Sequence, residues 1–246
     1  MTEFRGGPRL NENIETIKAE APVGIIGTGK MAIGLGTCFA QAGLPLRIGS
    51  RDPGNAQQFA DRLKLLAAER GADSRALSIV GGTVESVLRP CRVIVLAIPT
   101  RITNENGNAL DGVVDFLARH GDLIRGRNKI LVDITYYGPG NFGTPTPPEP
   151  FPSALEYHAS QFDDSAFLGK GGSTQWACGF KSVMWSSMRD GKTQGIEIAG
   201  DEEAKEALAA IILKAEFTPL DCGEVKDAGK VEPGGPQRQA HPQANV

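Results

Sequence analysis

Two glycines and an alanine follow a short apolar run, at Gly27, Gly29 and Ala32. In a dinucleotide-binding turn the first glycine permits a tight bend, the second lets a pyrophosphate approach the backbone, and the third small residue lets a helix pack closely on a strand. A helix that starts near Lys30 would point free N–H groups and the positive end of its dipole at the phosphates. Lys30 could itself approach the phosphates, or it could be a solvated residue at the helix start. The predicted cofactor-binding residues of this turn are Gly27, Thr28, Gly29, Lys30 and Met31.

The next apolar run ends in Ser50 and Arg51. An NAD-binding unit usually carries Asp or Glu at this point, where the carboxylate accepts hydrogen bonds from the ribose 2′-OH. A carboxylate would repel a 2′-phosphate, whereas a hydroxyl and a guanidinium would bind one, the guanidinium through two parallel hydrogen bonds. The pair therefore favours NADP(H) over NAD(H). In the alternative interpretation, Arg51 is a solvated turn residue and Asp52 binds the ribose.

Two later apolar runs, at 93–98 and 129–133, have the composition of buried parallel strands. Ligands of open α/β sheets lie outside the carboxyl ends of the strands. Residues at these two ends are therefore expected along the pyrophosphate, the nicotinamide ribose and the nicotinamide. They are Ile98, Pro99, Thr100, Arg101, Asp133 and Thr135.

Other polar side chains near these ends have open alternatives. Arg101 could bind phosphate or an anionic substrate, or it could be a surface loop residue. Tyr136 and Tyr137 could frame the nicotinamide or donate a proton, or they could pack a loop. We interpret His158 as a surface or packing histidine rather than a general acid, and we give no role to His120. No catalytic residue is assigned, because hydride transfer from NADPH needs little from side chains.

Apolar runs alternate with helical patterns along the chain, which predicts an α/β fold. We expect a doubly wound, mostly parallel sheet of the Rossmann type in a single domain over residues 22–228. The strands are expected at 23–26, 46–49, 78–80, 93–98, 129–133, 177–183, 195–199 and 218–221, and the helices at 30–42, 53–71, 83–88, 110–119, 153–162 and 201–214. Residues 1–21 are expected to form a flexible arm, residues 138–152 a loop, and residues 229–246 a disordered tail.

The composition excludes several classes of protein. The 246 residues carry a net charge of −3, which gives no electrostatic case for nucleic acid or an anionic membrane as a partner. No apolar run approaches the roughly 20 residues that span a bilayer, and the start of the chain lacks the apolar core of a signal peptide. Four scattered cysteines, Cys38, Cys91, Cys178 and Cys222, are interpreted as reduced packing residues of a cytoplasmic protein. No cluster has the spacing of metal ligands, so no metal is expected.

Several motifs together resemble the deazaflavin (coenzyme F-420)-dependent NADP reductase family and, with the same fold, the cytosolic reductase domain of the six-transmembrane metalloreductases. The matching segments are 27–32, 49–51, 95–99, 130–135, 152–157, 180–183 and 199–201. The segment 29–32 is also similar to pyrroline-5-carboxylate reductase. The chain departs from the family at Lys181, where the family has asparagine, and at 168–179, which looks like an insertion. No transmembrane part follows, so we do not expect a membrane ferric reductase.

The resemblance implies NADP(H) as cofactor, with a deazaflavin or flavin as a candidate co-substrate. The first functional hypothesis is a NADPH-dependent oxidoreductase that moves a hydride between NADP(H) and a deazaflavin, a flavin or a small organic acceptor. The second is an imine or carbonyl reductase of a biosynthetic pathway, and the third is a non-catalytic NADP(H) sensor. The expected partner is a small molecule, and a homodimer is one assembly that the sequence allows.

Overall fold

The computed structural model describes residues 2–3, 21–73, 76–103, 106–107, 109–135, 137, 147–162, 173–189 and 195–232. Tyr136, most of the predicted arm and tail, and parts of the segments 138–152 and 168–179 lie outside these residues. Within them, no helix is long and apolar enough to cross a membrane.

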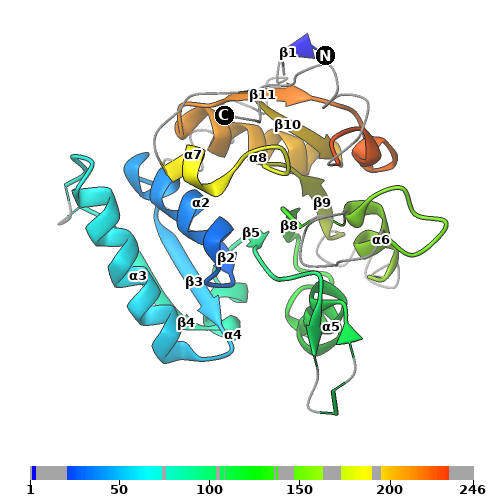
Figure 1. Ribbon diagram of the computed structural model, residues 1–246, viewed down its shortest axis with the longest axis horizontal. Helices are drawn as coiled ribbons and strands as arrows, with labels where there is room; N and C mark the ends of the chain where they lie inside the picture. Colours follow the sequence, from blue (N-terminus) through cyan, green and yellow to red (C-terminus); the bar gives the residue numbers. More distant parts are fainter. Residues whose placement is uncertain are drawn as a thin grey trace.

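Among the described residues, nine strands form one sheet in the order β1-β11-β10-β9-β8-β5-β2-β3-β4 (Figure 1). The strands are β1 (Thr2–Glu3), β2 (Val23–Ile26), β3 (Leu46–Ser50), β4 (Ile79–Thr83), β5 (Val93–Leu96), β8 (Ile130–Asp133), β9 (Gln175–Cys178), β10 (Gly195–Gly200) and β11 (Thr218–Asp221). From β4 across to β9 all neighbours are parallel, whereas β10 and β11 run the other way. The prediction of a mostly parallel, doubly wound sheet is confirmed.

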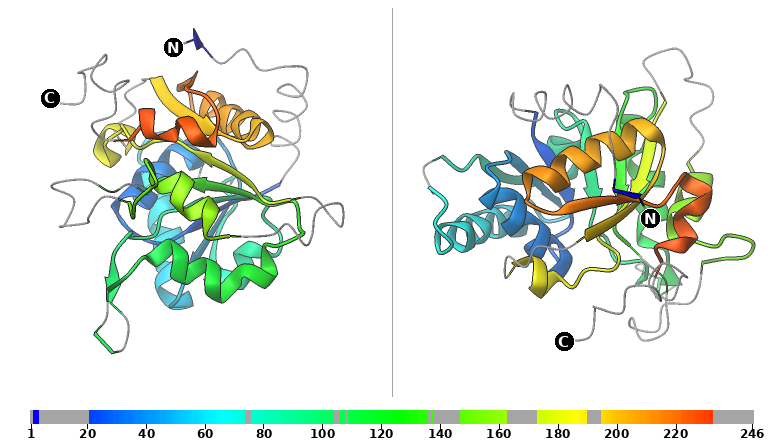
Figure 2. Two further views of the ribbon diagram at one scale, coloured as in Figure 1. Left: turned by 90° about the vertical axis from the view of Figure 1, so that its right-hand side faces the viewer. Right: turned by 90° about the horizontal axis from the view of Figure 1, so that it is seen from above.

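Helices cover both faces of the sheet (Figures 1 and 2). They are α2 (Lys30–Gln41), α3 (Pro53–Ala68), α4 (Val84–Leu88), α5 (Gly112–His120), α6 (Ala154–Ser160), α7 (Trp185–Arg189) and α8 (Glu202–Lys214), with short 3₁₀ helices η1 (Gly121–Leu123) and η3 (Val225–Lys230). Apolar side chains of α2, α3, α7 and α8 join one core cluster, and those of α4, α5, α6 and η3 join the other. A small hairpin, β6 (Ile102–Thr103) and β7 (Ala109–Leu110), precedes α5.

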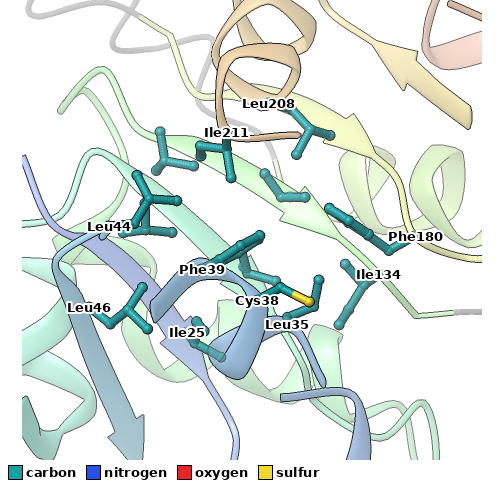
Figure 3. Packing of buried hydrophobic residues seen from close by; sticks show 14 of the residues in the cluster. Ile25, Leu35, Cys38, Phe39, Leu44, Leu46, Ile134, Phe180, Leu208 and Ile211 are labelled. Atoms are coloured by element: carbon teal, nitrogen blue, oxygen red, sulfur yellow. The ribbon is translucent and has the colours of Figure 1, made fainter. Parts of the chain in front are cut away.

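Successive residues of the central strands feed the two cores in turn. Ile25 belongs to the first cluster and Ile26 to the second, because neighbouring side chains of a strand point to opposite faces. In the first cluster, the Phe39 ring of α2 meets the Phe180 ring edge-on at a centroid distance of 6.0 Å (Figure 3). This aromatic contact joins the residues after β9 to α2.

Several predicted boundaries need correction. The central strand ends at Leu96 rather than residue 98. The strand predicted at 177–183 is β9, which ends at Cys178, and Phe180 beyond it has a φ of +60°, incompatible with a continuing strand. The helix predicted from residue 110 begins at Gly112, because the Asp111 side chain caps it.

The chain ends of the predicted domain also need correction. Thr2 and Glu3 pair with β11 as the short edge strand β1, so this part of the predicted arm is part of the sheet. Val231 and Glu232 are buried, and Gly229 lies within η3. The folded unit therefore includes residues 229–232, which the Pro- and Gly-rich composition had assigned to a disordered tail.

Candidate functional site

A cleft of about 670 Å³ lies at the carboxyl ends of β2, β3 and β5, and residues of α5 line another side of it. Predicted cofactor-binding residues that line it are Gly27, Thr28, Gly29, Ser50, Arg51, Ile98 and Pro99. The structure thus brings together three segments that are distant in sequence, and the position is where open α/β sheets bind ligands. Their contact with a cofactor stays a prediction.

The turn between β2 and α2 has a conformation that only glycine adopts easily. Gly27 has a φ of +113°, and a Cβ there would lie 2.3 Å from the carbonyl oxygen of Ala97. A Cβ on Gly29, by contrast, would meet nothing within 4 Å, so its place faces open space. Gly29 is also the N-cap of α2, with no side-chain cap on the first N–H groups. This cradle fits the diphosphate of a dinucleotide.

The end of β3 discriminates between the two interpretations of Ser50 to Asp52. The Asp52 carboxylate caps α3, since its Oδ1 accepts hydrogen bonds from the N–H groups of Gly54 at 2.8 Å and Asn55 at 3.3 Å. Asp52 does not line the cleft, whereas Ser50 and the exposed Arg51 do. The geometry favours Arg51 over Asp52 as the residue that meets the adenosine ribose.

The α5 wall of the cleft carries charges that the sequence interpretation did not use. Arg119 pairs with Asp115 at 2.9 Å, and the His120 ring lies 3.5 Å from the Glu85 carboxylate of α4. All four residues line the cleft, beside the apolar ring of Phe116. His120 is therefore at the site and not at an uninvolved helix end.

The remaining predicted residues lie away from the cleft lining. Lys30 and Arg101 are exposed, Met31 is half-buried, and Thr100 is buried. The prediction that Asp133 lies along the cofactor needs correction, because its side chain is fully buried. Its Oδ1 accepts hydrogen bonds from the backbone N–H and hydroxyl of Thr135, at 2.7 and 2.6 Å. The Asp133 carboxylate is thus enclosed, while contact of Thr135 with a cofactor stays a prediction.

A buried polar cluster lies beyond the end of β8, and we call Asp133, His158, Asp111 and Tyr137 the β8 cluster. The Nδ1 of His158 lies 2.7 Å from Asp133 Oδ2, and its Nε2 lies 3.2 Å from Asp111 Oδ1 and 3.5 Å from the Tyr137 hydroxyl. Tyr137 in turn donates a hydrogen bond to Asp111 Oδ2. His158 is completely buried, so the surface alternative of its interpretation is wrong and the packing alternative agrees with the structure.

The charges of the β8 cluster are set by burial and by the neighbours. Burial alone would lower the pKa of His158, but Asp133 and Asp111 outweigh it and raise that pKa to about 9. Burial would raise the pKa of Asp133, yet the charges of Lys181 and His158 hold it below its usual range. Burial and the hydrogen bond to Asp111 raise the pKa of Tyr137. At neutral pH the cluster holds an imidazolium, two carboxylates and a neutral phenol.

A second buried ion pair acts electrostatically on Asp133 of this cluster. The Lys181 ammonium is 2.7 Å from Glu232 Oε1, and Glu232 also accepts the backbone N–H of Ala154 at the start of α6. Lys181, where this chain departs from the reductase pattern, thus pairs with Glu232. Figure 2 shows η3, which precedes Glu232, close to α6, the helix that carries His158.

Part of this site could have been found in the sequence. His158 follows Ala154 and Leu155 at helical spacings of four and three, which place it on the buried face of α6. A histidine on a buried face needs a polar partner, and Asp133 at a strand end was already a candidate. No sequence signal pairs Lys181 with Glu232.

Comparison with known proteins agrees with this geometry. Residues 22–118 match the model of the family described as NADP oxidoreductase, coenzyme F-420-dependent. No curated protein matches the chain. Among solved structures, a hypothetical protein from Sinorhizobium meliloti superposes with a TM-score of 0.67 at 16% identity, covering 90% of this chain and 95% of that one.

Two further solved structures are similar. A protein from Arthrobacter sp. FB24, provisionally named a F-420-dependent NADP reductase, has a TM-score of 0.56 at 20% identity and covers 85% of this chain and 87% of its own. An imine reductase from Bacillus cereus BAG3X2 has a TM-score of 0.53 at 18% identity and covers 85% of this chain but 57% of its own. The chain thus has the fold of these three solved structures, and its residues 22–118 carry the sequence pattern of the coenzyme F-420-dependent NADP oxidoreductase family.

Proposed function

We propose that the protein is a NADP(H)-dependent oxidoreductase that moves a hydride between NADP(H) and a deazaflavin, a flavin or a small organic acceptor. The observation that carries the proposal is the cleft itself, which runs from the glycine cradle to Arg51. Arg51 is the cationic residue beside the strand end, and Asp52, the competing carboxylate, is committed to capping α3. A 2′-phosphate would therefore find a cation at the strand end, where the Asp52 carboxylate is engaged in the helix cap.

Each part of the cleft has a separate task in this proposal. The first N–H groups of α2 bind the diphosphate, and the bare Cα of Gly29 leaves space for it. Ser50 and Arg51 bind the 2′-phosphate, while Ile98 and Pro99 orient the cofactor along the end of β5. When bound, NADPH supplies the hydride, and the protein supplies orientation and a dry pocket. The buried free thiols support a cytoplasmic location for this activity.

A second candidate, reduction of an imine or carbonyl, is favoured by the β8 cluster. Such a reduction needs a proton for the heteroatom of the acceptor, and the His158 imidazolium, which contacts the Tyr137 hydroxyl, is a source of that proton. The cluster lies at the same edge of the sheet as the cleft, because Asp133 pairs with Leu96, the last residue of β5.

Binding and turnover test the proposal in two steps. Calorimetric titration of the full chain with NADPH and with NADH should show tighter binding of NADPH. NADPH oxidation should then follow the addition of one acceptor from coenzyme F-420, FMN, cyclohexanone and 2-methyl-1-pyrroline. Absence of NADPH binding would overturn the proposal. Binding without hydride transfer to any of the four would instead support a NADP(H) sensor.

A further inference from the structure

We propose that Tyr137 is the proton donor of the reaction, that His158 resupplies its proton, and that the acceptor carries a polarised C=O or C=N bond. The inference rests on the proposed function and narrows its acceptor. Tyr137 is the catalytic residue in this account, because its hydroxyl would touch the acceptor. His158, Asp133 and Asp111 are positioning residues that act through it.

The β8 cluster lies next to the cleft. Asp111 immediately precedes Gly112, which lines the cleft, and a Cβ on Gly112 would lie only 2.2 Å from the carbonyl oxygen of Pro99. Pro99 lines the cleft as well. The cluster therefore adjoins the part of the cleft that follows β5, away from Arg51 at the end of β3. That part is where the predicted nicotinamide end would lie.

Exposure identifies which member of the cluster could reach a ligand. His158 and Asp133 are completely buried, whereas Asp111 retains 12% exposure of its side chain and Tyr137 retains 8% of its residue surface. Asp111 is a carboxylate that caps α5 and has no proton to give. The Tyr137 phenol is the remaining candidate, since it is neutral and can rotate its O–H away from Asp111.

The neighbours of His158 explain why it can resupply that proton. Asp133 of β8 faces Nδ1, while Asp111 at the start of α5 and the Tyr137 hydroxyl face Nε2. On its own helix, the Tyr157 ring lies 5.5 Å away by centroids. The charge of Lys181, which pairs with Glu232, lowers the pKa of Asp133. The two carboxylates raise the pKa of His158 to about 9, so the imidazolium persists at neutral pH.

The proton and hydride balance in this scheme. The acceptor carbon gains the hydride from the bound cofactor, and its oxygen or nitrogen gains the proton from Tyr137 Oη. Oη takes the Nε2 proton of His158 at the same time, so no free phenolate forms. The products are NADP⁺ and the alcohol or amine, and solvent returns one proton to His158. The net reaction consumes NADPH, one proton and the C=O or C=N compound.

Phenylalanine substitution at Tyr137 tests the donor, and Tyr157→Phe is the matched control. Both changes remove one hydroxyl from the same aromatic group, in which the two tyrosine rings lie 6.4 Å apart by centroids. With cyclohexanone and 2-methyl-1-pyrroline as separate probes, Tyr137→Phe should lower kcat by about 10²-fold or more. Its KM and NADPH affinity should stay unchanged, and its melting temperature should show that the variant remains folded at the assay temperature. The Tyr157→Phe variant should keep the wild-type kcat.

The pH profile and the state of His158 give readouts that a structural role would not move. With the wild type, kcat should fall as pH rises past about 9, where the imidazolium is lost. The Tyr137→Phe variant should lack that limb. NMR of the His158 ring without substrate, assigned by comparison with His158→Gln, should show titration near pH 9 rather than near 6.5.

Other outcomes would overturn the roles of Tyr137 and His158 or the proposed function itself. An unchanged kcat in Tyr137→Phe, titration of His158 near its ordinary value, or turnover of FMN or coenzyme F-420 but neither probe would overturn the inference and leave the proposed oxidoreductase intact. No turnover of any of the four acceptors by a NADPH-binding wild type would overturn both. Turnover of one probe only would assign the bond as C=O or as C=N.

Discussion

The two polar regions of this molecule are built in opposite ways. The cleft, which we propose binds NADP(H), takes its key groups from turns directly after strands, so that a few consecutive residues, such as 27–29 and 50–51, define each part. The β8 cluster and its supporting ion pair take theirs from α5, β8, α6, the segment after β9 and the residues after η3. The cleft is open and combines the bare backbone of the glycine turn with surface side chains, whereas the cluster is buried and made of side chains that pair with one another.

The difference determines which substitutions disrupt each region. A backbone cradle depends on φ angles and on the absence of side chains, so it fails when a methyl group is added. A buried charge cluster depends on complete pairing, because an unpaired charge in the interior costs far more than a pair contributes. The variants below separate these two modes of failure.

The largest expected effect is on stability, in Lys181→Met. The Lys181 side chain is 1% exposed and pairs with Glu232, so its loss leaves a buried carboxylate without its cation. We expect a decrease of about 3–5 kcal/mol in the free energy of unfolding, measured by denaturant titration.

The double variant Lys181→Met with Glu232→Gln is the control, and it should recover most of that loss because no unpaired charge remains and the glutamine oxygen can still accept the Ala154 N–H. A cost below about 1 kcal/mol for the single change would mean that the pair behaves like an exposed one and that the contrast between the regions is wrong.

Alanine at the two cradle glycines should separate folding from binding. Gly27→Ala places a Cβ against the Ala97 carbonyl at a φ of +113°, and should lower the unfolding free energy by at least about 2 kcal/mol and abolish NADPH binding. Gly29→Ala meets no neighbouring atom and should keep the wild-type stability.

The Gly29→Ala variant should nevertheless lose NADPH affinity, since its methyl group would occupy the space assigned to the diphosphate. Calorimetry and thermal unfolding of both variants check this pair. Wild-type affinity in Gly29→Ala would place the phosphates elsewhere.

The β8 cluster should make stability depend on pH in a defined window. The pKa of His158 is raised from 6.5 to about 9 on folding, so its contribution is complete below pH 6.5 and is lost as pH rises through about 9. We expect the wild-type unfolding free energy to fall by on the order of 1–3 kcal/mol across this window. The His158→Gln variant should lack this decrease, and equal pH dependence in both proteins would argue against a charged His158.

The same contrast explains what the sequence could predict. The strands, the glycine turn and the Ser50–Arg51 pair follow from local patterns, because periodicity and turn chemistry act over a few residues. The end of the central strand was misplaced by two residues, since the apolar run continues to Ile98 after the sheet pairing stops at Leu96. Apolar character alone does not show where hydrogen-bond pairing ends.

Most of the β8 cluster cannot be predicted from local sequence patterns. Asp133 was identified at its strand end, but its carboxylate turns inward to a histidine 25 residues later. Glu232 lies in a Pro- and Gly-rich segment whose composition predicts disorder, and one buried ion pair with Lys181 places it in the fold. Long-range charge pairing leaves no periodic trace in a single sequence.

The most direct test of the account is the ratio of NADPH to NADH affinity in the wild type and in Arg51→Ala. Loss of the guanidinium should weaken NADPH binding by about tenfold to hundredfold, the worth of a charge-assisted hydrogen bond, and leave NADH binding unchanged. Asp52→Ser is the matched control, since serine can still cap α3, and its ratio should equal that of the wild type. An equal loss of both nucleotides in Arg51→Ala, or a changed ratio in Asp52→Ser with none in Arg51→Ala, would contradict the assignment of the cleft to NADP(H).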